Sequence, residues 1–330
     1  MKTLRLITTA AIACLAFAQA SDPAADPTPN AASDPAKLRV LVWNTEGGSN
    51  GYGPEGRQRV LQLIRDTKAD VVLWQESYKL NDENITLGHW VAKELGWNAW
   101  QSNSPHLCIV TPYEMLETFS HQPWHGVGAH LKDPEGRTFV AWSIWIDWRH
   151  FVSRASIDDP EITDAELLEL EAEKSSRLRQ ARDLMNRLEA LGHLALNEPL
   201  LVGGDWNCPS HLDWTVATAA AFPHRRALPL PVSTLVHEKG FLDTFRTVHP
   251  DPVAMPGNTW SPLHEKRESG ELDPPERIDR LYLKNPAAGP KLRPVRAHTL
   301  PENWADAQLP RETSPFPSDH AAVVIDLVWE

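Results

Sequence analysis

The sequence predicts a mixed α/β domain, and three observations support this prediction. Short β-rich runs alternate with segments of helical periodicity, beginning with a strand–loop–helix–strand unit. Several of these runs stop abruptly at glycine or polar residues, as strands do at the edge of a sheet. The 330 residues are enough to bury a large core, and they show no internal repeat or second-domain boundary. We therefore expect one folded domain over residues 37–330.

The first 36 residues differ in composition from the rest. Two basic residues precede the apolar run Leu6–Phe17, and Ala18–Ala20 fits a cleavage site. We expect residues 1–20 to be a secretory signal peptide and residues 21–36, rich in Ala, Asp and Pro, to be a disordered linker. The apolar run is too short for a stable membrane span. The expected product is exported, periplasmic or extracellular, without stable membrane insertion.

The first third of the chain predicts a β-loop-α-β unit. Residues 38–43 alternate and are β-rich, residues 54–67 have apolar positions at helical spacing, and residues 71–74 form a second buried run. If the two strands are parallel, the polar residues that follow them meet at one edge of the sheet. These residues are Asn44, Glu46 and Glu76.

The middle of the chain predicts several strands and one long helix. Thr163 and Glu166 have the spacing of a capping box, from which we expect a long amphipathic helix. One face of this helix is lined by Leu178, Ala181, Met185 and Leu188. The other expected elements are a helix over residues 89–95, strands over 97–101 and 107–110, and a hairpin of strands 126–131 and 138–146.

The last part of the chain predicts the central strand, over residues 200–206. Its apolar run ends in two glycines, and Asp205 and Asn207 follow two positions apart, so they face the same side of an extended chain. The Pro-rich segment 249–275 is long enough to expect a functional role. The remaining expected elements are a helix over 232–239, a strand over 277–283 that carries Asp279, and a last strand over 322–329 that follows Asp319 and His320.

Polar residues therefore collect at the predicted strand ends, and their types indicate a chemistry. Carboxylate oxygens without a Cys or His cluster suit a hard cation such as Mg²⁺ or Mn²⁺ rather than Zn²⁺. Amides that hold oxygens and a histidine that polarises a bond add the groups needed for hydrolysis of a phosphoryl ester. The set comprises Asn44, Glu46, Glu76, Asp205, Asn207, Asp279, Asp319 and His320.

The composition limits the partners. A formal net charge of −12 opposes tight non-specific binding of long duplexes but leaves room for a local basic cleft or bound cations. Cys108 and Cys208 either form a disulfide after export or stay as buried thiols. The 14 tryptophans are unusually many, and we expect core or cleft positions for most, with a few that stack on a sugar or base.

Five short motifs in this order resemble those of the endonuclease/exonuclease/phosphatase superfamily, the DNase I-like fold. The match runs from about residue 38 to residue 330. Within the superfamily, the stretches 207–215 and 256–260 resemble an exported bacterial subgroup. The resemblance implies a four-layer α-β-β-α sandwich of two packed mixed sheets with the site at one end. The motifs are Trp43-Asn44-Thr45-Glu46, Gln75-Glu76, Gly204-Asp205-Trp206-Asn207, Arg277-Ile278-Asp279 and Ser318-Asp319-His320.

The resemblance also implies catalytic roles. Asp205 would orient or deprotonate the attacking water, and Asn207 would hold a phosphoryl oxygen. Asp279 would fix and charge-stabilise His320, which would contact the scissile phosphate. Family members differ over which group is the base, so the roles of Asp205 and His320 are open to exchange.

A second set of residues is implied as the metal site. Glu76 would be the main ligand of Mg²⁺ or Mn²⁺, and Glu46 and Asp319 would assist directly or through water. Asn44 would help to position the metal and the phosphate.

The sequence departs from the family where a phosphate-contacting His or Tyr is usual, because Trp145 stands there. An indole N–H donates one hydrogen bond but cannot transfer a proton. Either that role is absent, or His150 or Arg154 reaches in from the following loop. We take Trp145 and His150 as substrate-binding candidates.

The expected function is a secreted, Mg²⁺-dependent hydrolase of phosphoric esters: a phosphodiesterase, phosphatase or nuclease that acts as a monomer. Its substrate would be a small ester, a phospholipid head group or a nucleic acid. The alternative is a non-catalytic binding protein on the same fold with a Trp-rich cleft. Trp145 supports the alternative, and the complete set of carboxylates opposes it.

Overall fold

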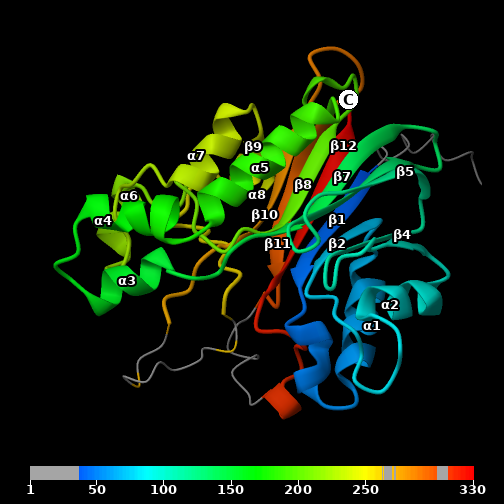
Figure 1. Cartoon of the computed structure of the whole chain (residues 1–330), viewed down its shortest axis with the longest axis horizontal. Coiled ribbons are helices and arrows are strands. Elements are labelled where there is room, and N and C mark those ends of the chain that lie inside the picture. Colours follow the sequence, from blue (N-terminus) through cyan, green and yellow to red (C-terminus); the bar gives the residue numbers. More distant parts are fainter. Residues whose placement is uncertain (1–36, 262, 264–269, 271–272, 303–310) are drawn as a thin grey trace, which may run out of the picture. The chain divides into compact units, whose positions relative to one another are not determined.

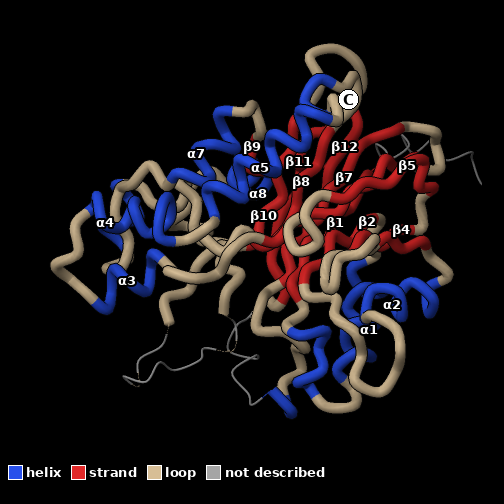
Figure 2. Tube along the Cα trace, viewed as in Figure 1, coloured by secondary structure: helices blue, strands red, loops and turns tan. Residues whose placement is uncertain are grey.

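Two mixed six-stranded sheets form the centre of the domain (Figures 1 and 2). The computed structural model describes residues 37–261, 263, 270, 273–302 and 311–330. In spatial order, the first sheet consists of β11 (Leu292–Leu300), β12 (Ala322–Trp329), β1 (Lys37–Asn44), β2 (Val71–Gln75), β4 (Cys108–Thr111) and β3 (Asn98–Trp100). The second consists of β5 (Glu114–Ser120), β6 (Gly126–Lys132), β7 (Thr138–Trp145), β8 (Leu200–Asp205), β10 (Asp279–Lys284) and β9 (Leu242–Asp243).

The alternation of side chains along the strands builds two kinds of core. Val40 and Val42 of β1 point between the sheets, where they join Leu201 of β8, whereas Leu41 and Trp43 point to the outer face of the first sheet. Within the first sheet β1 and β2 are parallel, and within the second β7 and β8 are parallel. Each sheet is therefore mixed and buried on both faces, as parallel neighbours require.

Helices cover both outer faces. The helices α1 (Gly56–Thr67) and α2 (Leu87–Leu95) pack on the first sheet, and α5 (Arg177–Ala190) and α7 (Pro231–Glu238) pack on the second, on opposite sides in Figure 1. This arrangement confirms the four-layer α-β-β-α sandwich. The other helical segments are η1 (Gly47–Tyr52), α3 (Val152–Asp158), α4 (Asp164–Glu169), η2 (Leu170–Lys174), η3 (His193–Ala195), α6 (Val216–Ala221), α8 (Thr244–Val248) and η5 (Arg311–Thr313).

The predicted signal peptide (1–20) and linker (21–36) lie outside the described residues. All described residues lie within the predicted domain, residues 37–330. Among the helices of that part, none combines the length and the apolar character needed to cross a membrane.

The prediction of one long helix after Thr163 is wrong. The capping box forms, with Thr163 and Glu166 bonded to each other, but it begins the short helix α4. A π-turn follows, Ser175 is extended, and α5 starts at Arg177. Tertiary contacts cause the break, because the Ser176 N–H donates to the Asp147 carboxylate at 2.8 Å and Arg177 is fully buried against a neighbouring loop.

The sequence patterns also fail to predict β5 and β11. Several side chains of β5 are exposed, so the strand lacks a clear apolar alternation. In β11 the pairing register shifts between Pro294 and Arg296, which interrupts the period of two. Both strands lie at the edge of a sheet, where burial constrains sequence least.

Cys108 and Cys208 are free thiols, which settles the alternative that the sequence left open for them. Cys108 is buried in the core between the first sheet and α1 and α2. Cys208 is buried in the core between the second sheet and α5 and α7, so the two residues belong to separate layers.

Two glycines of β8 allow a close approach of the backbone at the end of this strand. A Cβ atom on Gly203 would lie 2.7 Å from Leu73 and 2.8 Å from Val42, both of the opposite sheet. A Cβ atom on Gly204 would lie 2.0 Å from the backbone oxygen of Ile144 in β7. All three distances are too short for a Cβ atom. The absence of side chains at these two glycines therefore allows β8 to lie this close to its neighbours.

We expect Gly204→Ala to lower the free energy of unfolding by about 3 kcal/mol or more, at the upper end of overpacking costs, because its neighbour is rigid backbone. Urea denaturation of the purified domain measures this change. Gly51→Ala is the matched control, since its Cβ would meet no atom closer than 3.8 Å. Equal midpoints for Gly204→Ala and the wild type would contradict the close approach.

Candidate active site

Strand ends bring polar residues of both sheets together. Asn44 ends β1 and Asp205 ends β8, while Glu76 directly follows β2. The side-chain amide of Asn44 donates to Glu76 Oε1 at 3.1 Å and to Asp205 Oδ2 at 3.0 Å. One amide therefore joins a carboxylate of each sheet, at the edge that the sequence predicts.

Several of these residues have an unusual backbone conformation. Glu46, Glu76 and Asn207 all have positive φ, at 36°, 57° and 50°. A non-glycine residue in this region costs about 1–3 kcal/mol and is common at functional sites. Local hydrogen bonds hold the turns: the Gly47 N–H donates to Glu76 Oε2 at 2.8 Å, and the Asn207 N–H donates to Asp205 Oδ1 at 2.9 Å.

The Asn207 side chain also has a defined place. Its amide nitrogen donates to the Ile146 carbonyl oxygen at 2.8 Å, and the residue lines a cavity beside Asp205. An amide nitrogen carries two hydrogens, so one bond to the backbone leaves a second hydrogen for a ligand oxygen.

Asp279 and His320 form a buried pair. Asp279 Oδ2 lies 2.9 Å from His320 Nδ1, and Asp279 sits directly opposite Asp205 in the β8–β10 register. The Thr259 hydroxyl accepts the N–H groups of Ile278 and Asp279, each at 3.0 Å, which fixes the start of β10. The carboxylate therefore orients the imidazole from a rigid strand.

The free imidazole nitrogen of His320 faces two more carboxylates. His320 Nε2 lies 4.0 Å from Asp205 Oδ2 and 3.9 Å from Asp319 Oδ1. Burial lowers the pKa of His320, but the negative charges of Asp279, Asp319 and Asp205 together raise this pKa well above its usual value. Burial, with the nearby charge of Asp279, raises the pKa of Asp205 to about 7. At neutral pH the site therefore holds an imidazolium beside a carboxyl group that gains and loses its proton.

The donor atoms fit a hard divalent cation. Among the described residues, one group of His, Cys, Asp and Glu side chains has ligand atoms within 4.8 Å of one another, namely Asp205, Asp279 and His320. Asp279 Oδ1 is buried without a hydrogen-bond partner, and Glu76 lines the same cavity as Asp205. Carboxylate oxygens are the ligands that Mg²⁺ and Mn²⁺ prefer. We therefore assign metal binding to the carboxylates.

A cavity of about 510 Å³ opens beside this cluster. This volume lies in the range of small-molecule sites. One part of its wall is acidic and carries His320, and the rest is mainly aromatic. The lining residues are Glu76, Tyr78, Trp124, Trp145, Trp148, Phe151, Arg154, Asp205, Asn207, Trp260, Ile278 and His320.

The structure does not bring all predicted site residues to this cavity. Glu46 Oε1 accepts from Arg311 Nε at 2.8 Å, its other oxygen bonds the Tyr52 hydroxyl, and its side chain is not among those lining the cavity. His150 is exposed and lines a smaller neighbouring cavity of about 240 Å³. Of the two residues proposed to reach in beside Trp145, Arg154 lines the site cavity and His150 does not.

The sequence reasoning missed most of the aromatic wall. Tyr78, Trp124, Trp148 and Phe151 lie in loops after or between strands, and no spacing rule connects them. The high tryptophan content was the one available signal. It predicts aromatic cleft residues in general and cannot say which ones meet.

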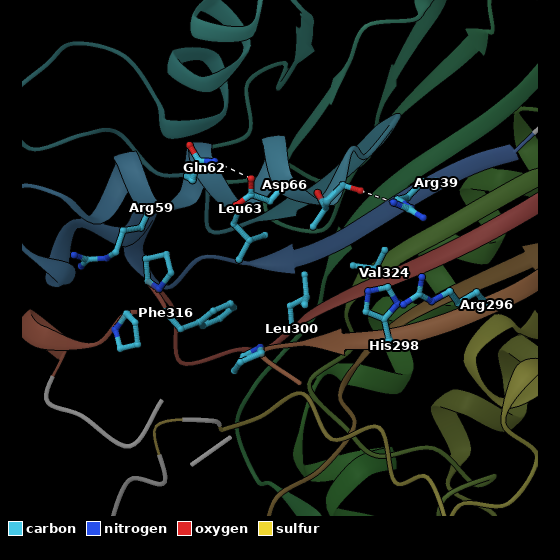
Figure 3. Close-up of a pocket in the computed structure, with 14 residues that line it drawn as sticks. Arg39, Arg59, Gln62, Leu63, Asp66, Arg296, His298, Leu300, Phe316 and Val324 are labelled. Carbon is cyan, nitrogen blue, oxygen red and sulfur yellow. Dashed lines mark hydrogen bonds between the residues drawn. The ribbon is translucent and has the colours of Figure 1, made fainter. Parts of the chain in front are cut away.

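A second cavity, of about 570 Å³, is lined by a different set of residues (Figure 3). Its lining residues include Leu63 of α1, Leu300 of β11 and Phe316 of the segment before β12. Its Arg39 is already paired with Asp326 at 2.5 Å. Although this cavity is larger, none of the predicted site residues lines it.

We expect Asp279→Asn to lower the pKa of His320, because the substitution keeps the shape of the side chain and removes a charge that raises this pKa. Titration of ¹⁵N-labelled histidines by NMR measures the shift, and Asp251→Asn, at an exposed loop position, is the matched control. An unchanged His320 titration in Asp279→Asn would contradict the assigned pair.

Comparison with known proteins places this chain in a family. A sequence profile of the endonuclease/exonuclease/phosphatase family matches residues 41–320. A Caenorhabditis elegans protein, uncharacterized protein F14F9.5, is 27% identical over 297 residues, which cover 87% of this chain and 89% of that protein.

Solved structures share the fold. D. rerio TDP2 complexed with a single-strand DNA product has a TM-score of 0.54 at 13% identity, with 88% of this chain and 99% of that chain covered. An endonuclease/exonuclease/phosphatase from Beutenbergia cavernae has a TM-score of 0.53 at 17% identity, with 88% and 71% covered. The family profile spans most of the sequence, and the chain therefore belongs to the endonuclease/exonuclease/phosphatase family.

Proposed function

We propose that this protein is a divalent-metal-dependent hydrolase of phosphoric esters. The observation that carries the proposal is the buried Asp279–His320 pair, whose imidazole Nε2 lies 4.0 Å from Asp205 Oδ2 beside a cavity that Glu76 also lines. Family membership supports the reaction class. The charges of the site suit a phosphate, because an imidazolium and a bound cation would both stabilise negative oxygens.

The different protonation states of His320 and Asp205 give these two side chains different roles. His320, held by Asp279, presents Nε2–H to a phosphoryl oxygen and stabilises the charge that develops there. Asp205, with a pKa of about 7, takes a proton from the attacking water near neutral pH, where a base of this strength is effective. Asn207 donates a hydrogen bond to a second phosphoryl oxygen, and the Asn44 amide holds Asp205 and Glu76 in position.

We propose Glu76 and Asp319 as the residues that hold Mg²⁺ or Mn²⁺. When bound, the cation supplies Lewis-acid stabilisation of the phosphate. Glu46 is assigned a supporting role, because both of its oxygens already bond Tyr52 and Arg311. The assignment rests on the oxygen donors of these carboxylates and on the position of Glu76 at the cavity.

We expect the purified protein to hydrolyse bis-(p-nitrophenyl) phosphate or p-nitrophenyl phosphate with Mg²⁺ or Mn²⁺. EDTA should abolish this hydrolysis. His320→Ala and Asp205→Asn should each lower kcat by roughly 10²–10⁴-fold, the usual contribution of a proton-transfer group. His89→Ala, at an exposed position on α2, is the control and should keep full activity. Comparison of the two esters separates phosphodiesterase from phosphatase.

Two results would contradict the proposal. Unchanged turnover in His320→Ala and Asp205→Asn would exclude these residues from the chemistry. Binding of the esters by folded protein without any turnover would favour the non-catalytic binding protein, which keeps the fold and uses the aromatic wall for recognition.

We also propose that the protein is exported, on the signal-peptide pattern of residues 1–20. Export predicts a mature chain that begins at Ser21. Intact-mass measurement of the protein isolated from the cells that naturally produce it detects this start. A product that retains Met1–Ala20 would refute export by this route.

A further inference from the structure

Two tryptophans at the site cavity are unusually exposed. Trp148 is 63% exposed and Trp124 is 47% exposed, and both line the cavity. Five other large apolar side chains of the described residues are similarly exposed, and all five are aliphatic residues that do not line this cavity. The exposed aromatic surface is therefore concentrated beside the acidic cluster, which points to a ligand rather than to chance.

The backbone that carries Trp148 is held firmly. The buried guanidinium of Arg177 donates to the carbonyl oxygens of Asp147, Arg149 and His150, at distances of 2.7–3.1 Å. The Asp147 carboxylate in turn accepts from the backbone N–H of Arg149 at 3.1 Å. These hydrogen bonds hold the turn in place while the indole of Trp148 stays exposed to solvent. Trp148 is therefore pre-organised to contact a ligand, because binding requires little further ordering of this turn.

The second tryptophan is supported by a cluster of rings. His106 packs against Trp124 at 4.9 Å, against Tyr78 at 5.3 Å and against Trp145 at 5.4 Å, measured between ring centres. His106 Nε2 lies 3.2 Å from the Trp124 carbonyl oxygen. Burial lowers the pKa of His106 to about 4, so the ring is neutral at physiological pH and remains part of an apolar wall.

The remaining part of the aromatic wall presents ring faces and few hydrogen-bonding groups to a ligand. Phe151 meets Trp260 edge-on at 5.4 Å, and Arg154 lies 5.9 Å over the same indole with its guanidinium bonded to Asp273. Apart from Arg154 and Tyr78, the polar lining residues belong to the phosphate site. A polyhydroxylated group would find few hydrogen-bond partners here, whereas a planar ring would find several faces.

We propose that these aromatic residues form a subsite for a planar ring attached to the substrate phosphate. The subsite consists of Tyr78, Trp124, Trp148, Phe151 and Trp260, with Trp124 and Trp148 at its open side. The inference rests on the proposed function for the phosphate part of the substrate. It narrows the substrate to phosphate esters that carry a nucleobase or an aryl group, and it disfavours phospholipid head groups.

Binding of small phosphates to the whole protein tests the subsite without turnover. Isothermal titration compares adenosine 5′-monophosphate and phenyl phosphate with ribose 5-phosphate and glycerol 3-phosphate, in the same buffer with EDTA, which stops metal-dependent hydrolysis of the ligands. At least one of the two ring-bearing ligands should bind at least tenfold more tightly than either ligand without a ring. The relative affinity of the nucleotide and the phenyl ester identifies the source of the ring.

Substitution then assigns the effect to the exposed tryptophan. Trp148→Ala should weaken binding of the tighter ring-bearing ligand roughly 5- to 100-fold, the loss expected for one stacking contact, and leave the affinity for ribose 5-phosphate unchanged. Trp148→Phe should retain most of the affinity, since it keeps a ring. Leu116→Ala, an exposed apolar position on β5, is the matched control and should change nothing.

Equal affinity for ligands with and without a ring, or an unchanged affinity in Trp148→Ala, would overturn the subsite. The proposed function fails differently, through loss of metal-dependent hydrolysis or through activity that survives His320→Ala. Hydrolysis of esters with no effect of the ring on affinity would support the proposed function and exclude the subsite. A protein that stacks the ring without turnover keeps the subsite as a recognition site.

Discussion

The close packing of the two sheets at the end of β8 is the constraint on which the active site depends. Gly203 lets the strand lie against Val42 and Leu73 of the opposite sheet, and Gly204 lets it lie against the backbone of β7. The next residue, Asp205, is thereby brought within reach of Asn44, whose amide joins it to Glu76. Residues of both sheets thus form one site because the layers are close at this edge.

Bringing acidic groups together in a buried place costs free energy, and cationic side chains offset part of this cost. His320 stands among Asp205, Asp279 and Asp319. Nearby, Arg277 pairs with the buried carboxylates of Asp213 at 2.8 Å and Asp243 at 2.7 Å, two positions before Asp279. Such buried pairs give little net stability but fix geometry, since loss of one partner leaves an isolated charge. Arg277 therefore acts in the motif as an anchor for the strand that carries Asp279.

The same molecule combines this polar edge with an aromatic wall. The wall is built from loops, and its rings are positioned by groups that do not themselves touch the cavity, such as His106 and Arg177. The broken helix has a function in this arrangement, because the start of α5 at Arg177 supplies the guanidinium that holds the turn around Trp148. A continuous helix would pass the same residues without this contact.

The sequence by itself determined the strands with polar ends, the capping box at Thr163, the order of the family motifs and hence the four-layer fold. These features are local, because periodicity, capping and turn chemistry act over a few residues. Only the tertiary structure decided that the Glu46 carboxylate bonds Arg311 and Tyr52 while Glu76 lines the cavity, that the helix breaks at Ser175, and that Trp124 and Trp148 share one cavity. Each of these outcomes depends on contacts between residues far apart in the chain, and no local pattern specifies which distant partner a side chain will meet.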